Sequence, residues 1–162
     1  MKKNTHLDVP YYSQWLDVQD PDWQRRACGI VALKMAMLAL RSLGEGGEIG
    51  LDELIKKGLA ISNAYNPKFG WVHDGLVSLA KEHGFQGSLR KEWINVESDK
   101  EGIQFIISTI EAGTPVMASV KSDTGGHLIL LIGFEKPARN ATHSVAGGEV
   151  DELKGFYYHD PD

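Results

Sequence analysis

The sequence contains a single cysteine, Cys28, and its position favours chemistry over simple packing. Cys28 opens a long apolar stretch that is predicted to be a helix, so its thiol lies at a helix N-terminus. Free N–H groups and the helix dipole favour the thiolate there, and the thiolate is the nucleophilic form. Gly29 follows directly and leaves the backbone around the sulfur accessible. We therefore expect a nucleophilic Cys28 with a lowered pKa; the alternative is a buried apolar side chain.

A thiol nucleophile needs a base, usually a histidine, and a group that orients the base. His127 follows Gly126 and begins an apolar stretch, residues 127–134, that is predicted to be a strand buried on both faces. Asp160 ends a later predicted strand, residues 155–160. If these two strands pair antiparallel, the start of the first lies beside the end of the second. His127 and Asp160 would then meet at one edge of the sheet.

The elements that must position these residues fall into two halves. The first half is predicted to be mainly helical and the second half to be antiparallel strands, which is the order of an α+β fold. The helix that starts at Cys28 is apolar nearly all round, so it is expected to be a buried central helix. Helices are predicted at residues 28–43, 51–57 and 74–83, the last capped by Asp74, and from a capping box at 98–101 to Gly113. Extended segments are predicted at residues 7–12, 85–90, 115–120, 127–134 and 155–160.

Length and composition predict one domain over residues 1–162, with a helical half at about 1–113 and a sheet half at about 114–162. Lys and Arg number 17 against 22 Asp and Glu, a net charge of −5, which argues against a nucleic-acid partner. No apolar run is long enough to span a membrane, and polar residues follow the first two lysines where a signal peptide would be apolar. A lone cysteine forms no internal disulfide and no cysteine metal site. We expect a cytoplasmic protein without metal or cofactor.

Four short segments, in chain order, carry a family resemblance. They are residues 10–14 (PYYSQ), residues 27–29 (ACG), Gly126 with His127 before an apolar strand, and residues 158–161 (YHDP). Together they resemble the papain-like cysteine peptidases, and within them the branch related to bacteriocin-processing, double-glycine leader peptidases. The resemblance spans nearly the whole chain. It implies a papain-like α+β fold, with a central buried helix packed on an antiparallel sheet, and hydrolysis of a peptide or isopeptide bond in a peptide or protein substrate.

The resemblance also implies a role for each matching residue. Cys28 would be the nucleophile, His127 the base and Asp160 the residue that orients the base. Gln14 would donate to the oxyanion, but it lies fourteen residues before Cys28, farther than in papain-like enzymes, and Gln19 and Gln24 remain alternatives. Family members usually continue beyond the aspartate, whereas two residues follow it here, so we expect Asp160 to be held loosely.

Three further residues are candidates for substrate binding: Trp71, His73 and Gly126. Trp71 has a core position as its alternative, and His73 an ordinary place at a helix N-terminus. His159 neighbours Asp160 but is expected to point to the opposite face of its strand, so it is not the predicted base. Two other functions remain open: an acyl or γ-glutamyl transferase with the same triad, and an inactive homologue that binds a peptide. The sequence leaves the oligomeric state open.

Overall fold

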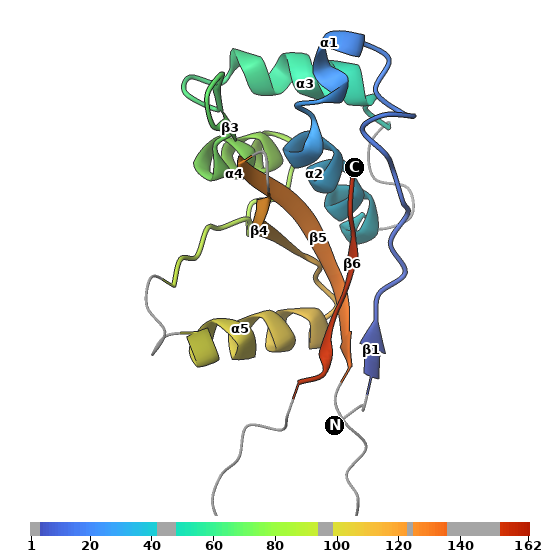
Figure 1. Cartoon of the computed structure of the whole chain (residues 1–162), viewed down its shortest axis with the longest axis vertical. Coiled ribbons are helices and arrows are strands. Elements are labelled where there is room, and N and C mark those ends of the chain that lie inside the picture. The colour runs from blue at the N-terminus through green and yellow to red at the C-terminus, as the bar shows by residue number, and fades with distance from the viewer. Residues whose placement is uncertain (1–3, 42–47, 94–98, 123–124, 136–152) are drawn as a thin grey trace, which may run out of the picture.

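The computed structural model describes residues 4–41, 48–93, 99–122, 125–135 and 153–162. It is an α+β structure of helices and antiparallel sheets, as predicted (Figure 1). The helices are α1 (Pro21–Gln24), α2 (Cys28–Leu40), α3 (Leu51–Ala60), α4 (His73–Glu82) and α5 (Asp99–Glu111). The strands are β1 (Asn4–His6), β2 (Tyr65–Asn66), β3 (Gly70–Trp71), β4 (Val116–Ser122), β5 (Gly125–Glu135) and β6 (Gly155–His159).

The strand β5 organises the main sheet, because β1, β4 and β6 all pair with it antiparallel. β4 pairs with the first part of β5, from Gly125 to Leu131, whereas β1 and β6 pair with the second part of β5. The predicted antiparallel pairing of β5 with β6 is therefore confirmed. Since β6 runs back along β5, its last residue, His159, lies opposite Leu130 in the middle of β5, and the chain continues from there toward the start of β5 (Figure 1).

The side chains of β5 alternate between two hydrophobic clusters, as a strand with a repeat of two requires. Leu128, Leu130 and Ile132 pack in the cluster that contains α2, α3 and α4. Ile129 and Leu131 pack in a second cluster with the α5 residues of the opposite face. The prediction that this strand is buried on both faces is confirmed.

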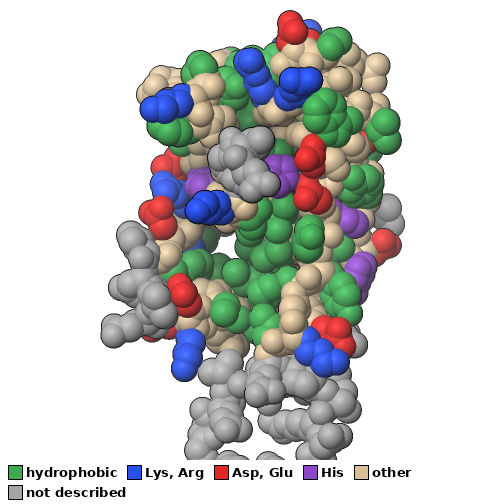
Figure 2. Space-filling view, in the orientation of Figure 1, with side chains coloured by type: hydrophobic (Ala, Val, Ile, Leu, Met, Phe, Trp, Pro, Cys, Tyr) green, Lys and Arg blue, Asp and Glu red, His purple; other side chains and the backbone are tan. Residues whose placement is uncertain are grey.

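The central helix α2 is buried from Gly29 to Met37, as its all-round apolar pattern predicts. It contributes to the larger cluster and contacts β5 along the sheet. α5 covers the opposite face less completely, because Ile106, Val120 and Phe156 in its cluster are only partly buried. Figure 2 shows apolar side chains over the middle of this face, between α5 and the helices at the top of the molecule.

Several predicted boundaries differ from the structure. The predicted strand at 85–90 is wrong: Gly84, with φ +94°, ends α4 in a turn, and no strand follows it in the described segment up to residue 93. The helix α4 starts at His73, one residue earlier than predicted, so Asp74 lies inside its first turn and does not cap it. The first strand is Asn4–His6, before the predicted extended segment at 7–12.

Other differences concern length. α3 continues to Ala60, beyond the predicted end at residue 57. The predicted irregular connection at 58–72 contains the short hairpin of β2 and β3, whose two-residue strands are too short to show an alternating pattern. α2 ends at Leu40, before the predicted end at residue 43, because the backbone of Arg41 is extended (φ −70°, ψ 128°), so the predicted helix stop at Gly44 is wrong. The first residue of the capping box, Ser98, lies outside the described residues.

Candidate active site

Cys28 is the first residue of α2, at the helix terminus predicted for it. The preceding residue, Ala27, offers no side-chain cap, so the first-turn N–H groups of the helix are not satisfied by a capping side chain. Backbone N–H groups of Leu128 and Gly29 form hydrogen bonds to the Cys28 sulfur. Because Leu128 directly follows His127 near the start of β5, the thiol lies beside the part of this strand that carries the predicted base.

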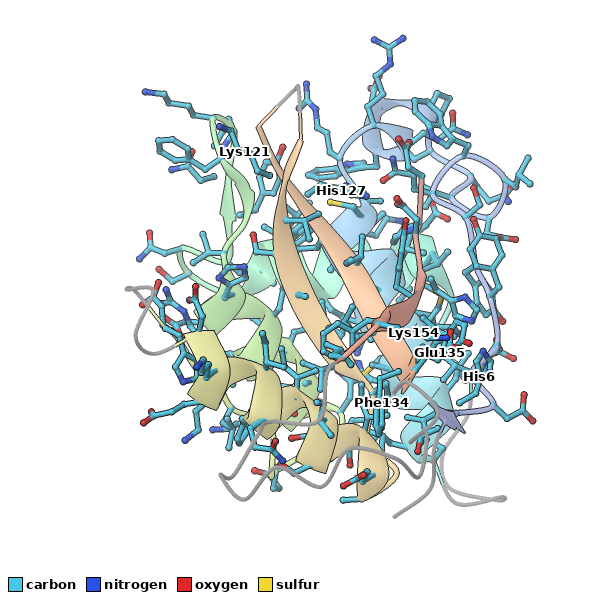
Figure 3. The ribbon with its side chains drawn as sticks, turned by 60° about the horizontal axis from the view of Figure 1, so that its bottom comes forward. His6, Lys121, His127, Phe134, Glu135 and Lys154 are labelled. Atoms are coloured by element: carbon cyan, nitrogen blue, oxygen red, sulfur yellow. The ribbon has the colours of Figure 1, made fainter. Side chains whose placement is uncertain are left out.

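His127 and Asp160 lie within hydrogen-bond distance, with His127 Nε2 2.6 Å from Asp160 Oδ1. The pairing of β5 with β6 brings them together, and His127 lies at the end of β5 remote from Phe134 and Glu135 (Figure 3). A carboxylate only accepts hydrogen bonds, so Nε2 carries the hydrogen. In the neutral ring Nδ1 is then the unprotonated nitrogen, which is the form a base needs.

The electrostatics of the thiol differ from the sequence-based expectation. Burial is the largest influence and raises the pKa of Cys28, and the N–H groups of Leu128 and Gly29 oppose it. The nearby carboxylates of Asp160 and Asp162 raise the pKa further, because a thiolate would be repelled by them. The net direction is upward, so the predicted lowering of the Cys28 pKa is wrong. Desolvation of the thiol, which the sequence pattern does not reveal, outweighs the helix-terminal N–H groups.

This direction predicts the pH dependence of alkylation. The thiolate is the reactive form, so iodoacetamide should modify folded Cys28 slowly at pH 6–7, with a rate that rises through a midpoint above the value of about 8.5 for a free thiol. The measurement is the alkylation rate against pH by mass spectrometry. The same protein unfolded in urea is the control, and its midpoint should lie near the free value. A folded protein that reacts at its maximal rate at pH 6 would contradict the raised pKa.

Gln14 is the glutamine that lies beside the end of β6. Its side chain is 4% exposed, and its Nε2 donates to Asp162 Oδ1 at 2.9 Å. Its backbone N–H donates to the Pro161 carbonyl. The other two candidates have different surroundings: the Gln24 amide donates to the carbonyls of Trp15 and Val18, and the exposed Gln19 donates its backbone N–H to Asp52.

Asp160 is tied to its surroundings by several hydrogen bonds, contrary to the expectation that it is loosely held. The Tyr11 hydroxyl donates to its carbonyl at 2.9 Å, and the backbone N–H of Asp162 donates to its Oδ1 at 3.1 Å. The neighbouring His159 bonds the Val9 carbonyl through Nε2, away from His127. Sequence reasoning missed Tyr11 and Asp162. The Asp-Pro-Asp sequence was the available signal for the latter, because aspartate often bonds the backbone two residues on.

The candidate substrate-binding residues have unequal exposure. Trp71 is 6% exposed, and its indole N–H donates to the Arg26 carbonyl at 2.8 Å. Its side chain lies directly under Gly29, where an added Cβ would approach within 3.0 Å of it, so Trp71 supports the first turn of α2 and its burial argues against a substrate contact. His73 is the partly buried first residue of α4. Gly126 is exposed with open space beside it, next to His127.

Within the described ranges, no group of three or more His, Cys, Asp and Glu side chains is arranged to hold a metal ion. None of the helices in these ranges has the length and apolar character that crossing a membrane requires.

A helix with a cysteine at its first residue, packed on a strand that carries a histidine bonded to an aspartate, is an arrangement suited to thiol chemistry. The chain matches the model of the Peptidase_C39 like family over residues 6–162 and belongs to this family. Membership supports cysteine peptidase activity on a peptide substrate. No curated protein and no solved structure matches the chain significantly.

Proposed function

We propose that this protein is a papain-like cysteine peptidase, of the branch related to bacteriocin-processing peptidases, and that residues 1–162 form one peptidase domain. The observation that carries the proposal is the 2.6 Å contact between His127 Nε2 and Asp160 Oδ1. The next residue of the strand, Leu128, bonds the Cys28 sulfur through its backbone N–H. Family membership over residues 6–162 supports it. The cytoplasmic location stays a prediction from the sequence.

The proposed reaction begins with Nδ1 of His127 accepting the thiol proton as the Cys28 sulfur attacks the carbonyl carbon. Because the thiol has a raised pKa, the proton leaves during the attack and not in a preformed ion pair. The oxyanion that forms is held by the Gln14 amide and the Cys28 backbone N–H. His127 then protonates the leaving amine, which leaves a thioester on Cys28, and water activated by His127 releases the acyl group.

Asp160 has a defined part in this proposal, which is to hold His127 with Nδ1 facing the thiol. Asparagine at position 160 still accepts a hydrogen bond from Nε2, whereas alanine offers no acceptor. We therefore expect Asp160→Asn to keep part of the activity, and we expect the cleavage rate of Asp160→Ala to be at least about tenfold lower than that of Asp160→Asn. The measurement is the cleavage rate of a mixed peptide library, followed by mass spectrometry.

The same assay tests the proposed function itself. Products released by water indicate a peptidase, and products joined to an added primary amine, in place of hydrolysis, would favour the transferase alternative. A protein that binds peptides but forms neither product would overturn the proposal. Asp160→Ala with full activity would leave the peptidase standing but remove Asp160 from the triad.

A further inference from the structure

A second aspartate lies two residues after Asp160, and its side chain contacts the N-terminal segment. Asp162 Oδ1 accepts hydrogen bonds from Gln14 Nε2 at 2.9 Å and from the Trp15 indole N–H at 2.5 Å. Its backbone N–H donates to Asp160 Oδ1, the oxygen that also contacts His127. Asp162 therefore links the proposed oxyanion donor to the proposed triad through hydrogen bonds.

This contact determines which way the Gln14 amide faces. A carboxylate only accepts, so the amide group next to Asp162 must be the nitrogen, and its second hydrogen stays available for another acceptor. The opposite atom, Gln14 Oε1, is buried and has no hydrogen-bond partner among the described residues. An unpaired buried carbonyl costs free energy. The cost is understandable if the nitrogen, and not the oxygen, is needed at the reaction centre.

We propose that Asp162 is a positioning residue that fixes the Gln14 side chain with its amide nitrogen directed to the oxyanion. The inference rests on the proposed function, because it concerns the same acyl-transfer site. It also accounts for a glutamine far from Cys28 in the sequence: the segment after β6 holds it, through both the Asp162 side chain and the Pro161 carbonyl.

Asp162 makes the inference testable, because it has two opposing effects on the site. Its negative charge hinders ionisation of the Cys28 thiol, whereas its hydrogen bond holds the Gln14 amide in place. Hydrogen bonds from Trp15 and Gln14 lower the pKa of Asp162, so its carboxylate is ionised at neutral pH. This charge raises the pKa of the Cys28 thiol. Removing it should make the thiol easier to ionise while it releases the oxyanion donor.

The experiment compares two probes of Cys28 at pH 7 that differ in their need for an oxyanion. Iodoacetamide is attacked by the sulfur with loss of iodide, and no oxyanion forms. p-Nitrophenyl acetate is attacked at its carbonyl carbon: an S–C bond forms, p-nitrophenolate leaves, and an oxyanion forms on the way. We expect Asp162→Ala to slow acetylation by about 10- to 100-fold, the scale of a misplaced catalytic group, without slowing alkylation.

Further variants separate the hydrogen bond of Asp162 from its charge. Asp162→Asn keeps an acceptor for the Gln14 amide and should restore acetylation to within about threefold of the wild type, which is small beside the loss of a whole donor. In a Gln14→Ala protein, adding Asp162→Ala should cause no further loss, because the group being positioned is absent. Asp8→Ala removes an exposed carboxylate of the N-terminal segment and serves as the matched control for a change of charge.

The outcomes separate this inference from the proposed function. If Gln14→Ala slows acetylation and Asp162→Ala does not, the positioning role is overturned and the oxyanion assignment stands. If Gln14→Ala acetylates at the wild-type rate, Gln14 is not the donor, and the inference falls together with that part of the proposed function. Equal losses with both probes in Asp162→Ala would indicate a general disturbance around Cys28, and would also overturn the positioning role.

Discussion

Replacing Cys28 with serine is expected to reduce peptide cleavage by about 10⁴-fold or more, the scale seen when a nucleophile is removed from a catalytic triad. The serine hydroxyl occupies nearly the same volume but is a far weaker nucleophile beside His127. Because the substitution hardly changes packing, the melting temperature should stay close to that of the wild type. The measurements are the cleavage rate of a peptide library and thermal unfolding by circular dichroism.

A matched variant in the same helix separates chemistry from packing. Leu33 in α2 is 5% exposed and belongs to the larger hydrophobic cluster. Leu33→Ala should reduce the free energy of unfolding by about 2–5 kcal/mol, the usual range for a buried leucine. If Cys28→Ser instead destabilises the fold as much as Leu33→Ala and leaves cleavage unchanged, Cys28 is a structural core residue and the proposed mechanism is wrong.

Replacing Phe134 with alanine is expected to cause the largest loss of stability among single substitutions in β5. Phe134 is fully buried and packs in the second cluster with Ile107 and Ile110 of α5. Truncating a buried phenylalanine costs about 3–5 kcal/mol, from lost burial and from the cavity left behind. Urea unfolding followed by tryptophan fluorescence measures the change.

Phe69 provides the matched control, because its side chain is 72% exposed. The same substitution there, Phe69→Ala, should change the free energy of unfolding by less than about 0.5 kcal/mol, as for most surface positions. Similar effects of the two substitutions would contradict the packing of α5 on this face of the sheet.

The sequence predicts the strand that carries the proposed base well, because its signals are local. The apolar run from 127 to 134 is too hydrophobic to face water on either side, and the structure buries its alternate residues in two clusters. The meeting of His127 with Asp160 follows from simple geometry once β5 and β6 pair antiparallel. The buried helix that begins at Cys28 follows from its all-round apolar pattern in the same way.

Properties that depend on distant contacts were not predictable from the sequence. The raised pKa of Cys28 comes from burial and from carboxylates more than a hundred residues away in the chain. The burial of Trp71 under Gly29 depends on how the β2–β3 hairpin packs against α2. The contact of Gln14 with Asp162 likewise joins segments that no local pattern connects.

The position of β5 has a consequence for the order of events during folding. Its second part pairs both with β1, at residues 4–6, and with β6, at residues 155–159. These pairs enclose long loops, and the entropy of closing a loop must be overcome before its contacts can repay it. The bond between His127 and Asp160 belongs to this late group of contacts. During synthesis on the ribosome, the segment that contains Cys28 is therefore made well before Asp160, and the proposed base lacks its proposed orienting partner until β6 has been made and paired.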